Sequence, residues 1–243
     1  MYVANQEVMQ TLDRYTMEQL GLPGVVLMEN AGNAVVQEIL FHYHKTTRVL
    51  VLAGSGNNGG DGFVIARRLI DLGYEALLCF IGQEEKLKGD AKVHFQVYKN
   101  RGLPLYYYNH SDKERFLTCV QQAHLIVDAM LGTGISGEVR SPFFEIIETI
   151  NDSNKDVIAV DVPSGLNSNT GKVANIAIRA KRTVTFAMPK IGFFIGDGPN
   201  YIGEWKVADI SVPDSIVETL QLQLPKLLDE KTAKECLPKR KPQ

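Results

Sequence analysis

A short apolar run at residues 49–52 leads directly into residues 54–62, which contain five glycines and two adjacent asparagines. Residues 63–70 carry apolar side chains at helical spacing and predict a helix that ends near Gly73. A strand, a glycine-rich loop and a helix in this order are typical of an α/β unit that binds phosphate, because the N–H groups at a helix N-terminus attract anions. The segment therefore predicts an α/β enzyme that binds a phosphate-bearing nucleotide.

The glycine-rich segment fits no standard phosphate-binding motif in full. Glycines 54, 56 and 59 satisfy the short dinucleotide fingerprint, but Glu84 comes about ten residues too late to make the expected ribose contact. The segment has no Lys followed by Ser or Thr, so it is not a P-loop and is poorly suited to phosphoryl transfer. A tight turn with positive φ is the structural alternative, and it would explain two of the five glycines.

The remaining apolar runs predict a parallel sheet with helices on both faces. Two helices, over residues 5–20 and from Pro23 to about residue 40, are predicted before the first strand. Short, continuously apolar strands that alternate with helices are typical of a sheet buried on both sides. The further predicted strands span residues 76–81, 104–108, 125–128, 157–161, 183–187 and 205–210.

The character of the sequence changes after Pro213. The strand signal ends there, and Gln, Leu and Lys become frequent. We therefore predict one domain over residues 1–213 and a linker or small helical appendage over residues 214–243.

Composition and charge argue against several classes of protein. The chain has 44% hydrophobic residues and a formal net charge of −2, so it has no general attraction for nucleic acid or an anionic membrane. No apolar run is long enough to span a bilayer and no leader is recognisable, so we expect a cytoplasmic location. Cys79, Cys119 and Cys236 are widely spaced and odd in number, which indicates reduced thiols.

Acidic and small residues follow two further predicted strands. Asp128 begins Asp128-Ala-Met-Leu-Gly-Thr-Gly, and Asp161 begins Asp161-Val-Pro-Ser-Gly. Because the carboxyl ends of parallel strands lie at one edge of a sheet, these segments and the glycine-rich segment are expected to share one site. The side-chain oxygens of Asn58, Asp128 and Ser164 are suited to a hard cation. Either aspartate could instead cap the helix that follows it.

Five motifs occur in order along the chain. They are Leu27-Met-Glu-Asn-Ala-Gly, Gly54-Ser-Gly-Asn-Asn-Gly-Gly-Asp-Gly-Phe-Val-Ile-Ala-Arg-Arg-Leu, Asp128-Ala-Met-Leu-Gly-Thr-Gly, Asp161-Val-Pro-Ser-Gly-Leu and Thr185-Phe-Ala-Met-Pro-Lys. Together they resemble the NAD(P)HX epimerase family, also called the YjeF N-terminal domain, over about residues 1–213. The resemblance implies a Rossmann-like three-layer αβα sandwich with a mainly parallel central sheet. It also implies a dimer formed through the two N-terminal helices, and a repair reaction that interconverts the R and S forms of hydrated NADH or NADPH.

The resemblance further implies roles for individual residues. Those that would bind substrate are Asn57, Asn58, Gly59, Gly60, Asp61, Gly132, Thr133, Gly134, Ile135, Ser136, Gly137, Glu138 and Asp161. Those that would hold a potassium ion are Asn58, Asp128 and Ser164, and the identity of this ion comes only from the resemblance.

The implied reaction needs an acid–base group. The hydroxyl at C6 of the hydrated ring lies beside the ring nitrogen, whose lone pair can expel it once an acid protonates it. Water can then add to the planar iminium from either face. Asp161 is the candidate for this group, a role worth about 10²- to 10⁴-fold in rate, and Lys190 could tune that acid or hold a phosphate. The alternative for Asp161 is a purely ligand-binding role.

Two other functions are compatible with the fold class. A catalytically silent nucleotide-binding scaffold would share it, but the glycine-rich loop and both strand-end acids are intact here. A nicotinamide-dependent dehydrogenase is disfavoured because the chain contains no Tyr-x-x-x-Lys pair. In relatives fused to a dehydratase domain, a hinge similar to residues 224–237 leads into that domain, so the chain could be the N-terminal half of a bifunctional enzyme.

Overall fold

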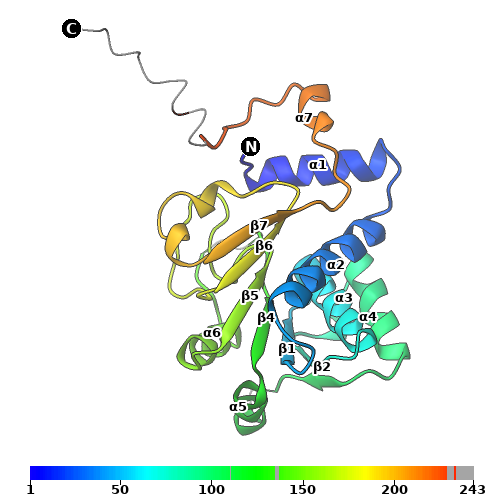
Figure 1. Ribbon diagram of the computed structural model, residues 1–243, viewed down its shortest axis with the longest axis vertical. Helices are drawn as coiled ribbons and strands as arrows, with labels where there is room; N and C mark the ends of the chain where they lie inside the picture. Colours follow the sequence, from blue (N-terminus) through cyan, green and yellow to red (C-terminus); the bar gives the residue numbers. More distant parts are fainter. Residues whose placement is uncertain (110, 135–136, 229–232, 234–243) are drawn as a thin grey trace, which may run out of the picture.

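The computed structural model describes residues 1–109, 111–134, 137–228 and 233. Its centre is a seven-stranded sheet in the order β3-β2-β1-β4-β5-β6-β7, and every neighbouring pair of strands is parallel (Figure 1). The strands are β1 (Arg48–Ala53), β2 (Glu75–Phe80), β3 (Leu105–Tyr107), β4 (Leu125–Ala129), β5 (Asp156–Val160), β6 (Arg182–Phe186) and β7 (Glu204–Ala208). Each overlaps a strand predicted from an apolar run.

Helices cover both faces of the sheet. They are α1 (Gln6–Glu18), α2 (Gly24–His42), α3 (Asn57–Asp71), α4 (Gly89–Asn100), α5 (Lys113–Gln122), α6 (Phe143–Asp152) and α7 (Ser215–Thr219), with short 3-10 helices η1 (Glu84–Lys86), η2 (Ile191–Phe193) and η3 (Gly198–Asn200). Val49 and Val51 of β1 pack with α2, α3 and α4, whereas Leu50 and Leu52 pack with α5 and α6 (Figure 1). The alternation of the strand side chains thus separates two cores, and the predicted αβα sandwich with two N-terminal helices is confirmed.

Helix α3 begins at Asn57, six residues before the predicted start at residue 63. Glycine has a low helix propensity, so the sequence pattern favoured a loop over residues 54–62. The missing side chains instead allow close packing. A Cβ at Gly59 would lie 1.9 Å from the carbonyl oxygen of Gly54, and one at Gly62 would lie 2.9 Å from Cβ of Ala129. The glycines therefore allow the first turns of α3 to pack directly against β1 and β4.

The two ends of the described chain pack together. The N–H of Val3 donates a hydrogen bond to the carbonyl of Pro225, at 2.9 Å, and Ala4 forms a parallel bridge with Lys190. Within the segment predicted as a linker or appendage, Ile216 and Val217 of α7 are buried in the larger core. The bridge at Ala4 fixes the start of α1 beside residues 189–191.

The described cysteines agree with the expectation of reduced thiols. Cys79 and Cys119 are unpaired, and burial raises the pKa of the Cys79 thiol. Cys236 lies outside the described residues. None of the helices in the described ranges is both long and apolar enough to cross a bilayer.

Candidate functional site

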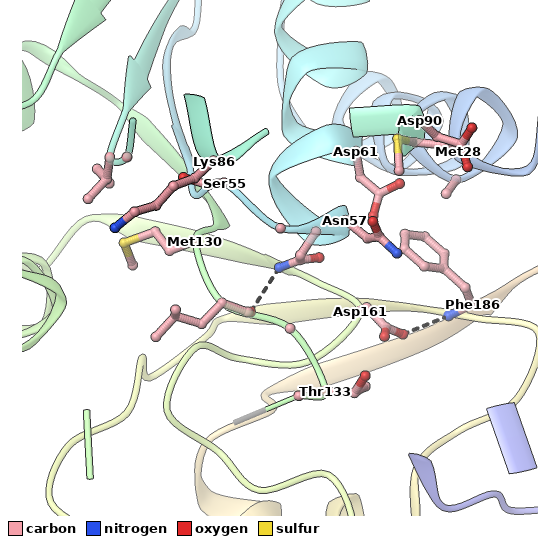
Figure 2. Close-up of a pocket in the computed structure, with 18 of the residues that line it drawn as sticks. Met28, Ser55, Asn57, Asp61, Lys86, Asp90, Met130, Thr133, Asp161 and Phe186 are labelled. Atoms are coloured by element: carbon pink, nitrogen blue, oxygen red, sulfur yellow. Dashed lines mark hydrogen bonds between the residues drawn. The ribbon is translucent and has the colours of Figure 1, made fainter. Parts of the chain in front are cut away.

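A cavity of about 1060 Å³ opens at the carboxyl edge of the sheet (Figure 2). The strand order reverses between β1 and β4, and the chain leaves these two neighbouring strands toward opposite faces of the sheet. Ligands bind at such a switch point in open α/β sheets. Ser55 and Asn57 after β1, and Gly132 and Thr133 after β4, line this cavity. Its volume is at the upper end of ordinary ligand pockets.

The N-terminus of α3 opens onto the cavity. Gly56 is the N-cap residue and provides no side-chain acceptor for the first turn of the helix. A Cβ at Gly56 would meet no atom within 4 Å, so the space in front of this helix end is open. Uncapped N–H groups and the helix dipole together favour an anion at this position.

Three oxygen-bearing side chains are buried together beneath the cavity. Asp128 at the end of β4 and Ser164 after β5 are fully buried, and Ser164 donates from Oγ to Oδ1 of Asp128 at 2.6 Å and from its N–H to Oδ2 at 2.8 Å. Asn58 donates from Nδ2 to the carbonyl of Leu131 at 2.9 Å, whereas its buried Oδ1 has no hydrogen-bond partner among the described residues. Burial raises the pKa of Asp128 to about 6, against the hydrogen bonds from Ser164. The buried carboxylate of Asp128 has no basic partner in the described ranges. Together with the unpaired amide oxygen of Asn58, it forms a set of oxygen ligands that a bound cation would complete.

Asp161 is held in place by one oxygen of its carboxylate. Its φ of 61° is unusual for a residue with a side chain, and it ends β5 one residue earlier than predicted. Oδ1 accepts hydrogen bonds from Nζ of Lys190 at 2.6 Å, Oγ1 of Thr185 at 3.0 Å and the N–H of Phe186 at 3.3 Å. No side chain or N–H in the described ranges donates to Oδ2. Asp161 lines the cavity, so this second oxygen is available for chemistry.

Lys190 is buried and does not line the cavity. Its side chain is 1% exposed. In addition to Asp161, its Nζ donates to Oγ1 of Thr185 and to the carbonyls of Phe186 and Met188, at 2.9 to 3.1 Å. The ammonium group is therefore fully occupied by the protein, and this geometry favours the tuning role predicted for Lys190 over phosphate binding.

Two more carboxyl groups line the cavity near Asp161. Asp61 comes from α3 and Asp13 from α1, and Figure 2 shows Asp61 facing the part of the cavity that contains Asp161. Burial, and then the charges of Asp161 and Asp13, hold the pKa of Asp61 well above its usual range. Burial also raises the pKa of Asp13 to about 6, although the charge of Lys190 opposes it. One end of the cavity thus brings three carboxyl groups together, those of Asp13, Asp61 and Asp161.

The predicted substrate residues occupy three kinds of position. Those that line the cavity are Asn57, Asn58, Asp61, Gly132, Thr133, Gly134 and Asp161. Those outside its lining are Gly59, Gly60, Gly137 and Glu138. Ile135 and Ser136 lie outside the described residues. Gly59 and Gly60 instead serve packing, since a Cβ at Gly60 would lie 2.4 Å from the sulfur of Met28.

Several parts of the cavity wall had not been predicted, among them one face of α1 and the turn after β2. Gln6, Gln10 and Asp13 project from one face of α1, and Lys86 comes from η1 after β2. The signal for α1 was the spacing of these three polar residues at i, i+4 and i+7, which places them on one helix face. Such a row normally indicates a solvent-exposed face, so the sequence alone did not assign it to a site.

The chain is similar to several named proteins. Residues 24–192 match the family described as YjeF-related protein N-terminus. The chain is 37% identical to the NAD(P)H-hydrate epimerase of Weissella koreensis, over 84% of this chain and 89% of that protein. It is 39% identical to the NAD(P)H-hydrate epimerase of Limosilactobacillus reuteri, over 85% of this chain and 94% of that protein.

Longer relatives and a solved structure extend the comparison. The chain is 36% identical over 99% of its length to the bifunctional NAD(P)H-hydrate repair enzyme Nnr of Moorella thermoacetica, but it covers only 46% of that protein. It therefore spans less than half the length of this relative. The crystal structure of yeast YNL200c shares the fold with a TM-score of 0.77 at 23% identity, over 96% of this chain and 98% of that one.

Proposed function

Because the chain belongs to the family of YjeF-related proteins, we propose that it is an isomerase that interconverts the R and S forms of hydrated NADH and hydrated NADPH (NADHX and NADPHX). Such a reaction repairs damaged nicotinamide nucleotides. The observation that carries the proposal is that Asp161 lines the same cavity as the uncapped N-terminus of α3. A reactive carboxylate and a phosphate-binding helix end are thus available to a single bound nucleotide. The names of the relatives lend no support to the alternative of a silent scaffold.

In the proposed reaction the protein donates one proton to the substrate and then takes one back. An acid gives a proton to the C6 hydroxyl, the C6–O bond breaks with electrons from the ring nitrogen, and water departs. Water then adds to the opposite face of the iminium and loses a proton to a base, so the protein returns to its starting state. Asp161, with Oδ1 held and Oδ2 available, is the acid–base group we assign to this exchange.

Asp61 is suited to supply a second proton position. Because burial and the nearby charges of Asp161 and Asp13 hold its pKa above the usual range, Asp61 binds a proton more tightly than an ordinary aspartate does, whereas Asp161 forms an ion pair with Lys190. Two carboxyl groups in different environments can divide the acid and base roles between them. Within the substrate-binding set, we therefore expect Asp61 to act on the leaving hydroxyl as well as to bind substrate.

Asn58, Asp128 and Ser164 are the residues that would hold a potassium ion. The unpaired Oδ1 of Asn58 and the buried carboxylate of Asp128 provide the fit. Bound there, the ion would supply a positive charge that compensates Asp128. The role of these three residues is to fix the segments after β1, β4 and β5, which form the floor of the cavity.

We also propose an assembly for the protein. Met17, Leu20 and Val26, at the junction of α1 and α2, are 38%, 51% and 38% exposed, and this apolar surface supports a homodimer formed through the N-terminal helices. In its native context the chain is proposed to be followed by a dehydratase domain, because several relatives, such as the one from Moorella thermoacetica, are bifunctional repair enzymes. Its place of action is proposed to be the cytoplasm.

A direct assay tests the function. Acid-hydrated NADH, supplied as mixed epimers and partly depleted of one, is incubated with the protein, and exchange between the forms is followed by chromatography with and without potassium. Exchange faster than in buffer supports the epimerase. Saturable nucleotide binding without exchange would support the scaffold instead.

A further inference from the structure

The two ends of the cavity differ in charge. Asp13, Asp61 and Asp161 lie at one end, whereas Lys86 is the one Lys or Arg among the residues that line the cavity within the described ranges. Figure 2 shows Asp61, Asn57 and Asp161 in one part of the cavity and Lys86 to the left of all three, beside Ser55 and Met130. A ligand whose reacting ring contacts the carboxyl groups, and whose pyrophosphate caps α3 at Asn57, would extend toward Lys86 with its remaining half.

The Lys86 side chain is exposed and takes part in none of the salt bridges among the described residues. Its neighbour Glu84, which could have neutralised it, is instead paired with Lys99, with Nζ 2.7 Å from Oε2. The next residue, Leu87, is 3% exposed and anchors η1 to the larger core. Within the described part of the chain, Lys86 is therefore an unpaired cation on an anchored turn.

The surroundings of Lys86 suit a purine base. Gly82, just before η1, packs closely against the glycine-rich segment, because a Cβ at this position would lie only 2.1 Å from Oγ of Ser55. Tyr108, Met130 and Phe143 line the cavity and belong to one hydrophobic cluster. Aromatic and apolar side chains around a planar base are the usual basis of sequence-independent base binding.

The geometry points to this end of the cavity as the site of the adenosine half of the substrate, with Lys86 binding the 2′-phosphate that distinguishes NADPHX from NADHX. The inference rests on the proposed function and adds to it a preference for NADPHX over NADHX. A lysine ammonium binds phosphate as a point charge, with charge-assisted hydrogen bonds. Since the group is exposed, we expect about a tenfold preference for the phosphorylated ligand at low salt.

A binding experiment tests the inference without depending on catalysis. ADP-ribose and 2′-phospho-ADP-ribose differ only in the phosphate, and the affinity of each is measured by titration calorimetry for the intact protein and for Lys86→Ala, Lys86→Arg and Lys88→Ala. Lys88 is an exposed lysine two residues away that does not line the cavity. We expect the ratio of the two dissociation constants to be about ten in the intact protein, Lys86→Arg and Lys88→Ala, and about one in Lys86→Ala.

Three results would overturn the inference. The first is equal affinity of the intact protein for the two ligands. The second is a preference that persists in Lys86→Ala, and the third is loss of the preference in Lys88→Ala. A protein that shows the preference but does not exchange the epimers would refute the proposed function and leave the phosphate site standing.

Discussion

Nζ of Lys190 lies 2.6 Å from Oδ1 of Asp161, and the side chain of Lys190 is only 1% exposed. The pair connects the end of β5 to the turn after β6, two segments 29 residues apart. Because Lys190 has no access to a ligand, it acts through the carboxylate that it orients. Asp161 therefore combines a fixed position with one available oxygen, as an acid–base group requires.

Replacement of Asp161 by Asn should abolish catalysed epimerisation while the fold remains. The amide retains the shape and one acceptor for Lys190 but cannot take up a proton, so we expect a loss of at least about 10²-fold in rate. Without the charge of Asp161 to neutralise it, the buried Lys190 should cost about 3 kcal/mol of stability. This is less than the total free energy of unfolding of a typical domain, so the variant should still fold. Chromatographic exchange, corrected for the uncatalysed reaction, measures the rate, and circular dichroism verifies the fold. Full activity would remove Asp161 from the mechanism.

Replacement of Lys190 by Met should lower kcat much more than it changes KM. The lysine does not line the cavity, so the nucleotide keeps its contacts, but Oδ1 of Asp161 loses its closest donor. We expect about a 10²-fold fall in kcat, with KM and the affinity for ADP-ribose altered by less than about threefold. A large rise in KM with unchanged kcat would indicate instead that Lys190 binds the nucleotide.

Alanine should destabilise the protein at Gly59 and have little effect at Gly56. A Cβ at Gly59 would lie 1.9 Å from the carbonyl oxygen of Gly54, whereas one at Gly56 would meet nothing within 4 Å. We expect Gly59→Ala to reduce the free energy of unfolding by about 3 kcal/mol, despite the gain in helix propensity. Gly56→Ala should remain within about 1 kcal/mol of the parent protein. Urea unfolding measures both, and equal effects would contradict the packing role of Gly59.

These glycines also show why the fold was more predictable than the site. A buried parallel strand needs only a short apolar run, a local property, so each strand is visible in the sequence. The start of α3 was placed too late because packing requires its glycines: a Cβ at Gly59 would meet the carbonyl oxygen of Gly54, and one at Gly62 would meet Ala129 at the end of β4, a neighbour that only the tertiary structure provides. Local propensity is overridden by packing at this point.

The sequence predicted the site residues that follow strands, but it did not predict those that α1 brings to the same edge of the sheet. Asp128 and Asp161 follow strands, so the topology of a parallel sheet already places them at one edge. Asp13 reaches the same edge because Ala4 pairs with Lys190 and positions α1. No local pattern in α1 specifies that pairing. The burial of Lys190 is a similar case, because its partner is distant in the sequence.

Potassium should stabilise the folded protein through Asn58, Asp128 and Ser164. A ligand at about 100 times its dissociation constant adds about 2.7 kcal/mol, which corresponds to roughly 5–10 °C in Tm for a chain of this size. Thermal unfolding in potassium chloride and in N-methylglucamine chloride of equal ionic strength measures the difference. Asn58→Ala should remove the response because the orphaned Oδ1 is lost, and the neighbouring Asn57→Ala should retain it. An identical Tm in both salts would leave the cluster without a bound ion.

Replacement of Asp13 by Asn should stabilise the protein above pH 6 and have little effect below pH 4. Burial raises the folded-state pKa of Asp13 from 3.8 to about 6, so the folded protein holds this proton more tightly than the unfolded chain does. The contribution of Asp13 to stability is therefore most favourable at low pH, falls as the pH rises from about 4 to about 6, and stays constant above that range. Asn cannot ionise, so the variant should gain about 1–2 kcal/mol over the parent protein at pH 8. Urea unfolding at pH 4 and pH 8 measures the gain, with Glu7→Gln, an exposed acid on the same helix, as the control that should change little. A gain that is equal at both pH values would mean that the ionisation of Asp13 carries no such cost.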